Sequence, residues 1–217
     1  MIAKEVSSAI ALSDRVHSRL LEAFEEAMED SPDEMDIRDG LTLDACNLAL
    51  DHAEALRTLL ELGLNASGLA MLRLQYEALL RATWVFYAAK DGEVAMLAAP
   101  LTTGTSDSAK KLPMANELLS AVERSEAPAP LRLGLREFRT TAWDAMNSYV
   151  HGGIHPLRRS GSGHPVEELT TAIQSSNAMS YSSLMLAAAT VGCIELIGNI
   201  NVIVTSHPGF ARSIQRR

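Results

Sequence analysis

Three charged residues at four-residue spacing are the first feature of this sequence that could do chemistry. Arg73, Glu77 and Arg81 lie within LAMLRLQYEALLRATWVFYAA (69–89), a segment that is apolar almost all round a helical wheel. Charges on such a helix must be paired, because an unpaired buried charge costs several kcal/mol. Glu77 can pair with Arg81 or, in the reverse order, with Arg73. The stripe predicts either a salt-bridge ladder between helices or a polar pocket with these residues in its wall.

A second stripe leads to a histidine at the end of a predicted helix. Within residues 131–151, Arg139, Asn147 and His151 are spaced so that they share one helix face. His151 directly precedes two glycines that suit a left-handed C-cap. The carbonyl-rich end of a helix raises the affinity of a histidine for a proton. Two interpretations are open: His151 caps its helix, or it transfers protons or binds an anion at the rim of a pocket.

The segment that follows, GGIHPLRRSGSGHP (152–165), is predicted to be a loop. Arg158 and Arg159, with nearby Gly and Ser amides, could hold a phosphate or a nucleic-acid backbone; a solvated basic loop is the alternative. Its histidines are separated from His151 by glycines and match no zinc motif, so no metal site is expected. The sequence also lacks Walker, G-x-S-x-G and G-x-G-x-x-G motifs, and no cofactor is expected.

The elements that must position these residues are helices. Ala and Leu are abundant, and alternating Val/Ile/Thr runs between turn residues are missing from the sequence. The expected fold is all-α: a single bundle of five to seven helices. Its expected parts are an acidic helix over 1–30, a bundle core over 41–205 and a short basic tail over 206–217. The main predicted helices cover 4–29, 42–62, 66–90, 113–125, 131–151 and 177–204, and a further one opens at Pro165.

Charge is unevenly distributed along the 217 residues, whose formal net charge is −8. Residues 1–54 carry 14 acids and 4 bases, whereas the remaining 163 residues carry 13 acids and 15 bases. Any contact with nucleic acid is therefore expected from the part after residue 54. The two cysteines form no C-x-x-C pair and the start lacks an uninterrupted apolar stretch. We therefore expect a cytoplasmic protein.

One apolar stretch is long enough to raise the question of a membrane. Residues 184–204 carry a single charge, Glu195, over 21 positions. Glu195, Asn199 and Asn201 would each be costly in lipid. The prediction is a buried helix of a bundle or of a dimer interface, and a C-terminal membrane anchor is the alternative.

Two segments of the sequence resemble a family of bacterial helical domains that is related to the HEPN superfamily. They are DHAEALRTLLELGLNASGLAMLRLQYEALLRATW (51–84) and MNSYVHGG (146–153), and the resemblance extends over roughly residues 40–205. HEPN ribonucleases carry an Arg, a polar residue, three further residues and a His at a helix end. Asn147 and His151 match the polar and His positions, whereas Met146 occupies the Arg position.

The resemblance implies an RNA-binding or RNA-cleaving protein of a toxin–antitoxin or phage-defence system, acting as a homodimer. If catalytic, it would be a metal-independent ribonuclease with His151 as general acid or base and Asn147 as an orienting group. Arg73 or Arg139 would stabilise the phosphorane in place of the missing motif Arg. RNA, a cognate antitoxin protein and a second copy of the chain are the expected partners. The candidate binding residues are Arg73, Glu77, Arg81, Arg139, Arg158 and Arg159.

A different class of protein is the alternative. The chain would be a non-catalytic helical bundle that binds a partner protein or a small ligand. In that case Arg73, Glu77 and His151 would line a structural polar core.

Overall fold

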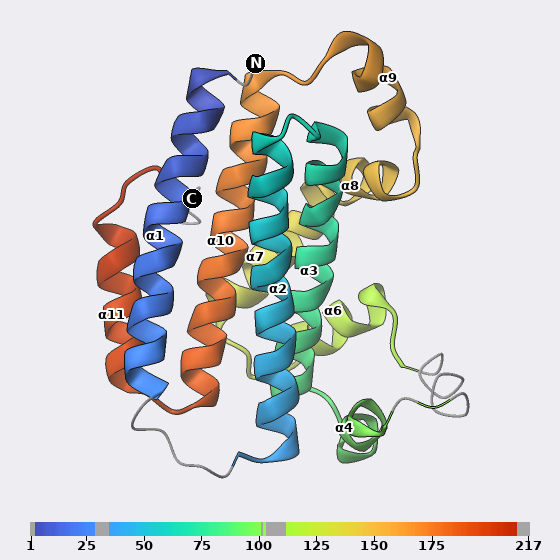
Figure 1. The fold of residues 1–217 in the computed structure, drawn as a ribbon. Helices are drawn as coiled ribbons and strands as arrows, with labels where there is room; N and C mark the ends of the chain where they lie inside the picture. Colours follow the sequence, from blue (N-terminus) through green and yellow to red (C-terminus); the bar gives the residue numbers. More distant parts are fainter. Residues whose placement is uncertain (1–2, 29–34, 101, 103–111, 212–217) are drawn as a thin grey trace.

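The computed structural model describes residues 3–28, 35–100, 102 and 112–211, and over these ranges the chain is all-helical, without strands (Figure 1). The described residues form ten helices, so the expected number of five to seven is wrong. They are α1 (Lys4–Met28), α2 (Ile37–Glu61), α3 (Asn65–Tyr87), α4 (Asp91–Ala98), α6 (Ala115–Glu123), α7 (Ala129–Thr141), α8 (Trp143–Val150), α9 (Ile154–Ser162), α10 (Val166–Thr190) and α11 (Ile194–Thr205).

The predicted helix over 131–151 is wrong as one continuous element, because it breaks at Ala142 into α7 and α8. The hydroxyls of Thr140 and Thr141 both donate to the carbonyl oxygen of Glu137, at 3.0 and 2.7 Å. Such back-bonding competes with the backbone ladder and bends helices. The break lets α8 pack against α3, and this places Asn147 beside it.

The predicted loop over 152–165 is also wrong, because it contains α9 (Figure 1). Gly152 has a φ of +64°, which ends α8 sharply, and Gly153 is the N-cap of α9. Pro156 lies in the first turn, where its missing N–H is tolerated. The backbone N–H of His155 donates to Ser148 Oγ at 3.1 Å and satisfies one of the free donors of that turn.

The predicted helix over 177–204 is likewise interrupted. α10 ends at Thr190, Gly192 takes a φ of +69°, and Cys193 Sγ accepts a hydrogen bond from the backbone N–H of Leu196 at 3.4 Å as α11 begins. A glycine inside an apolar run is compatible with a helix, so the sequence pattern alone did not mark this turn. Among the residues that the structure describes, no helix has the length and apolarity needed to span a membrane.

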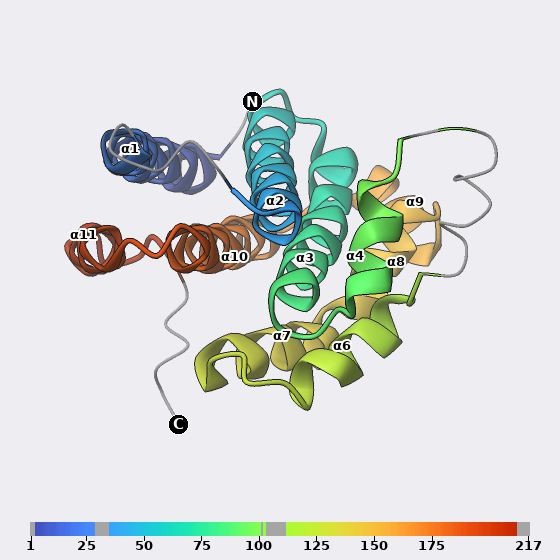
Figure 2. The same cartoon turned by 90° about the horizontal axis from the view of Figure 1, so that it is seen from below.

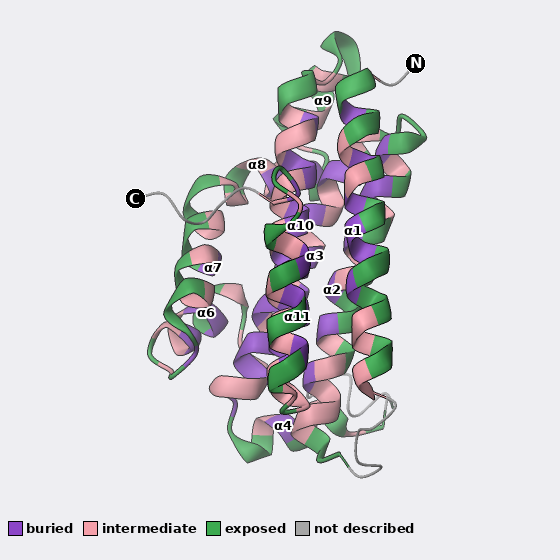
Figure 3. Cartoon of the chain, turned by 90° about the vertical axis from the view of Figure 1, so that its left-hand side faces the viewer, coloured by how far each residue is buried: buried purple, intermediate pink, exposed green. Residues whose placement is uncertain are grey.

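α3 is the central helix of the core. Its apolar face, including Tyr76 and Trp84, is buried against α2, α6, α8 and α10, as the purple segments of Figure 3 show. Polar bonds fix its register on α10: Gln75 Nε2 donates to the carbonyl oxygen of Ser176 at 2.9 Å, and Ser176 Oγ donates to Gln75 Oε1 at 2.7 Å. All of these groups are buried, so the pairing satisfies atoms that could not reach water.

A second apolar cluster lies between α1, α10 and α11, on the opposite side of α2 and α10 from α8 and α9 (Figure 2). It includes Leu20, Leu184 and Ile200. Phe210 belongs to it as well, and its carbonyl oxygen accepts a hydrogen bond from Asn177 Nδ2 at 2.6 Å. The described part of the expected basic tail, residues 206–211, therefore packs onto the core, and residues 212–217 lie outside the described residues.

Candidate functional site

The indole of Trp143, at the start of α8, is the centre of a cationic cluster. The guanidinium carbon Cζ of Arg73, from α3, lies 4.1 Å from the centroid of the Trp143 ring. Cζ of Arg139, from α7, lies 3.6 Å from it. Both distances are well within the range of cation–π attraction. Two cations from different helices are thus held on one aromatic side chain.

Arg73 is the better-compensated of the two cations. Its Nε and Nη2 donate to Glu77 Oε1 at 3.1 and 2.8 Å, and its Nη1 donates to Asn147 Oδ1. The Arg73 side chain is 15% exposed, so the Glu77 carboxylate offsets a charge that is largely removed from water. Arg73 therefore fixes the amide of Asn147 while its own charge is balanced.

Arg139 is held by neutral groups. Its Nε and Nη2 donate to Asn116 Oδ1, on α6, at 3.1 and 2.5 Å. Within the described ranges, no carboxylate forms an ion pair with Arg139. The charge of this half-buried guanidinium is therefore available to an anion that enters the cluster.

Packed aromatic side chains of the core support the cluster. The Tyr76 ring stacks on Phe138 at a centroid distance of 4.9 Å and meets Trp143 edge-on at 5.8 Å. Burial raises the pKa of the Tyr76 hydroxyl above its usual range. These packed rings lock the rotamer of Trp143, so the positions of both guanidiniums are set by the core.

His151 stands one helix turn after Asn147. It is the C-cap residue of α8, and its backbone N–H donates to the Asn147 carbonyl oxygen at 3.1 Å. Its side chain is exposed, which leaves the imidazole open to solvent and to a ligand. The structure thus places an accessible histidine on the last turn of the helix that carries Asn147 and Trp143.

The other predicted binding residues lie outside this cluster. Arg81 makes no hydrogen bond to Glu77, and burial lowers the pKa of its guanidinium, whose Nη1 has no partner among the described residues. Arg158 is exposed on α9, and Arg159 forms an ion pair with Glu168 Oε2 at 3.0 Å. Of the six predicted binding residues, the cluster contains Arg73, Glu77 and Arg139.

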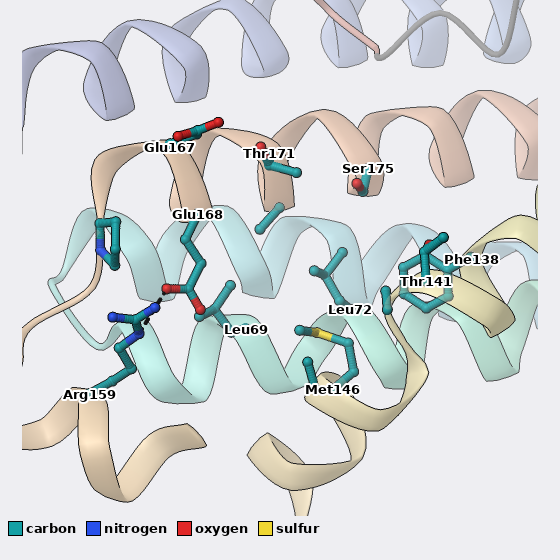
Figure 4. Close-up of a pocket in the computed structure, with 14 residues that line it drawn as sticks. Leu69, Leu72, Phe138, Thr141, Met146, Arg159, Glu167, Glu168, Thr171 and Ser175 are labelled. Atoms are coloured by element: carbon teal, nitrogen blue, oxygen red, sulfur yellow. Dashed lines mark ion pairs between the residues drawn. The ribbon is translucent and has the colours of Figure 1, made fainter. Parts of the chain in front are cut away.

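A groove of about 430 Å³ runs on the other side of α8 (Figure 4). Leu69 and Leu72 of α3 and Met146 of α8 line its middle. Phe138 and Thr141 lie at one end, and the Arg159–Glu168 ion pair lies at the other. The remaining lining residues are Ala142, Ala145, Pro165, Glu167, Thr171, Ala172 and Ser175.

Sequence reasoning missed Trp143 as a site residue, together with Asn116, Glu168 and the groove. Trp143 lies four residues after Arg139 and four before Asn147, so its place in the stripe was a usable signal. Asn116 and Glu168 come from other helices and carry no comparable pattern. Among the described residues, no group of three or more His, Cys, Asp or Glu side chains could hold a metal ion.

Comparison with protein families places the chain in a family of unknown function, DUF6988, whose model matches residues 46–212. The chain belongs to this family, and the match includes every residue of the cluster and of the groove. Neither the curated proteins nor the solved structures contain a match to the chain.

Proposed function

We propose that this chain binds RNA and cleaves it without a metal ion, with the Trp143 cluster as its phosphate site. The observation that carries the proposal is the placement of two guanidiniums, from α3 and α7, on the indole beside Asn147. In the proposed HEPN-like site, Met146 occupies the position of the motif Arg. Arg73 brings a guanidinium to Asn147 from another helix instead.

The two cations take different roles in this site. Arg139, whose charge no carboxylate offsets, contacts the phosphate and stabilises the charge that builds up in the transition state. Arg73 is a positioning residue, because its ion pair with Glu77 leaves it little net charge while it holds the Asn147 amide. Asn147 then orients the ligand, one turn before His151.

His151 is the proposed proton carrier. In metal-free RNA cleavage the ribose 2′-oxygen attacks phosphorus, and the bond from phosphorus to the 5′-oxygen breaks. An imidazole can take the proton of the 2′-hydroxyl and deliver a proton to the leaving 5′-oxygen. The exposed side chain of His151 supports this role, because substrate can reach it without any rearrangement of the core.

The distribution of charge supports an RNA site on this side of the molecule. α1 and the first half of α2 belong to the acidic part of the sequence, residues 1–54. α1 lies on the far side of α2 and α10 from α8 and α9 (Figure 2). α1 is therefore separated from the cluster by other helices, and salt weakens the effect of its negative charge there.

The test is binding and cleavage of a fluorescent single-stranded RNA by the purified chain at low salt, with and without EDTA. Arg139→Gln is expected to reduce the dependence of log Kd on log salt by about 0.7, the loss of one phosphate contact. Arg136→Gln is the matched control, because Arg136 lies on the same helix but pairs with Glu123 at 2.6 Å. Wild-type chain that neither binds nor cuts RNA at low salt would overturn the proposal.

The remaining expectations rest on the resemblance and, for the dimer, also on the apolar stretch over residues 184–204. We propose that the chain is a homodimer and that a cognate antitoxin or a phage-defence system is its biological setting. Light scattering of the purified chain measures the first of these directly, and a monomeric mass would contradict it.

A non-catalytic bundle that binds a small ligand or a partner protein is the second candidate. The bidentate pair of Arg73 with Glu77 favours it, because a guanidinium so fully bonded is typical of structural networks. Absence of RNA binding and cleavage at low salt, together with a loss of stability in His151→Ala, would select this candidate.

A further inference from the structure

The groove beside α8 combines apolar walls with one polar end, and this combination restricts what it can bind. Leu69, Leu72 and Met146 line its middle. At about 430 Å³ it falls in the size range of small-molecule sites. The charged groups are confined to the end formed by α9 and the start of α10, whereas the hydroxyls of Thr141 and Ser175 lie toward the other end (Figure 4).

That end offers hydrogen-bond donors and acceptors side by side. Glu168 Oε1 accepts from the Tyr149 hydroxyl at 2.9 Å, and Oε2 pairs with Arg159 Nε at 3.0 Å. Arg159 pairs with Glu168 through Nε, and its guanidinium also lies within hydrogen-bonding reach of the Tyr149 hydroxyl. A guanidinium has five N–H donors, so these two contacts leave donors for a ligand. The Arg159 and Glu168 side chains are 36% and 26% exposed, and both line the groove. Glu168 Oε2 is itself buried and accepts no hydrogen bond from the described residues, so it is an unmet acceptor at this end of the groove.

The charges at this end favour a neutral head group. Arg159, Glu167 and Glu168 together carry a net charge of −1, which disfavours a carboxylate or phosphate there. A cationic group would be repelled by the Arg159 guanidinium. A neutral group with its own donors and acceptors satisfies both members of the ion pair without a net charge.

We propose that the groove binds a nucleobase. A base is neutral and planar, and its edge carries the mixed donors and acceptors that the Arg159–Glu168 pair requires. Guanine is the best match, because neighbouring N–H donors on its edge suit a carboxylate while its O6 accepts from a guanidinium. The ring lies against the apolar middle of the groove, where the Met146 sulfur makes a favourable contact with an aromatic ring.

The groove and the Trp143 cluster are built from the same helices. α8 contributes Met146 to the groove and Asn147 to the cluster, and α3 contributes Leu72 and Arg73 in the same way. Phe138 lines the groove and also stacks on Tyr76, which contacts Trp143. The groove and the cluster are therefore connected through Phe138, which lies at the end of the groove opposite the Arg159–Glu168 pair. For a base that belongs to RNA, the inference rests on the function proposed above.

Two arms of one experiment distinguish a free nucleotide from RNA. In the first, guanosine and uridine are titrated into full-length chain labelled with ¹³C at the methionine methyl groups. We expect guanosine to shift the Met146 signal, assigned from Met146→Leu, with at least fivefold tighter binding than uridine. In the second arm, guanine-containing and uridine-only RNA hexamers are compared, and the guanine-containing one is expected to bind more tightly.

Variants separate the groove from the phosphate site. Ala145→Leu fills the groove from a half-buried position and is expected to weaken guanosine binding at least tenfold. Glu168→Gln, which keeps an oxygen for Tyr149, is expected to reduce the preference for guanosine. Glu137→Gln, on the exposed face of α7, is the control and leaves binding unchanged. Circular dichroism and the remaining methyl signals verify that each variant is folded.

The outcomes distinguish the proposed groove site from the proposed RNA function. Guanosine binding that Ala145→Leu abolishes supports the groove site, and if RNA does not bind, the base comes from a free nucleotide and the RNA function fails. RNA binding without base preference, with no nucleoside shift at Met146, overturns the groove site and leaves the RNA function standing. Absence of binding in both arms overturns both.

Discussion

Arg57 and Arg139 show how differently the two sides of the molecule treat a cation. Arg57, on α2, is 7% exposed, and its Nε donates to Asp14 Oδ1 of α1 at 2.7 Å. Arg139 is half-buried on α7, and its hydrogen bonds to the described residues go to a neutral amide. A buried charge needs a carboxylate to offset its desolvation, whereas a charge within reach of water or an anion does not. The first arrangement holds two helices together, and the second leaves a cation ready for a ligand.

The histidine near Arg57 and the histidine near Trp143 also lie in different environments. Near Arg57, His17 is buried and its ring meets Phe210 edge-on at 5.4 Å. Near Trp143, the exposed His151 ends a helix. Arginine and histidine thus contribute to the packed core on one side of the molecule and remain accessible to solvent on the other. Substitutions on each side test this difference.

The largest expected effect on stability is at the buried His17 on α1, and it depends on pH. Burial, with a smaller contribution from the Arg57 guanidinium, lowers the pKa of His17 from 6.5 to about 4. The folded state disfavours the charged imidazole. The contribution of neutral His17 to the free energy of unfolding is therefore complete above pH 6.5 and is lost as the pH falls toward 4. The free energy of unfolding should decrease by about 3 kcal/mol over this interval from His17 alone.

His17→Phe isolates this contribution, because it keeps a ring beside Phe210 and removes the titrating group. Urea unfolding at pH 7 and pH 4 gives the loss of stability for each protein, and protonation of carboxylates affects both alike. His155→Phe, at an exposed histidine, is the control. Equal losses for wild type and His17→Phe would show that His17 does not titrate in this way.

The next effect concerns the carboxylate inside the candidate site. Glu77→Ala leaves Arg73 without its ion pair and is expected to lower the free energy of unfolding by about 2 kcal/mol. Glu77→Gln should cost about half as much, because its amide oxygen still accepts a hydrogen bond. Glu123→Ala, which breaks the more exposed pair with Arg136, should cost less than about 1 kcal/mol. Equal thermal midpoints for wild type and Glu77→Ala would place Arg73 outside any buried network.

The sequence predicted the helices better than their ends and breaks. The bounds of α1 and α3 were predicted within three residues, because capping residues and apolar periodicity are local signals. The break at Ala142 involves threonine hydroxyls that donate to the carbonyl oxygen of Glu137, and the turn at Gly192 has a φ of +69°, which a glycine permits but does not require. Neither feature is encoded in a pattern of hydrophobicity.

Only some members of the candidate site were predicted from the sequence, and the contacts that bring them together from different helices were not predicted. Arg73 and Asn147 each stand on a recognisable stripe, but they are 74 residues apart, and only the packing of α8 on α3 brings them together. That Glu77 selects Arg73 over Arg81 likewise depends on the position of neighbouring helices. The groove is formed by surfaces from several helices, none of which carries a motif of its own.

A smaller effect on stability is expected at the uncompensated cation. Arg139→Gln loses a cation–π contact and two hydrogen bonds to Asn116, which water can replace in part. We expect a change in the free energy of unfolding of less than about 1 kcal/mol, measured by urea unfolding. A loss as large as that of Glu77→Ala would assign Arg139 a structural role and would remove the difference between it and Arg57.

The smallest effect on stability is expected at His151, together with the largest effect on any ribonuclease activity. His151→Ala should change the free energy of unfolding by no more than about 0.5 kcal/mol, because the side chain is exposed and its helix keeps the backbone bond to Asn147. RNA cleavage should be abolished, because His151 is the proposed proton carrier, while RNA binding should change less than twofold. His155→Ala is the matched control, since His155 is an exposed histidine on the neighbouring helix α9. Stability and cleavage must be measured on the same purified variants. Strong destabilisation of the fold by His151→Ala would show that His151 is not the proton carrier. The same conclusion would follow if His151→Ala and His155→Ala reduced cleavage equally, and the catalytic role proposed for this side of the molecule would then be wrong.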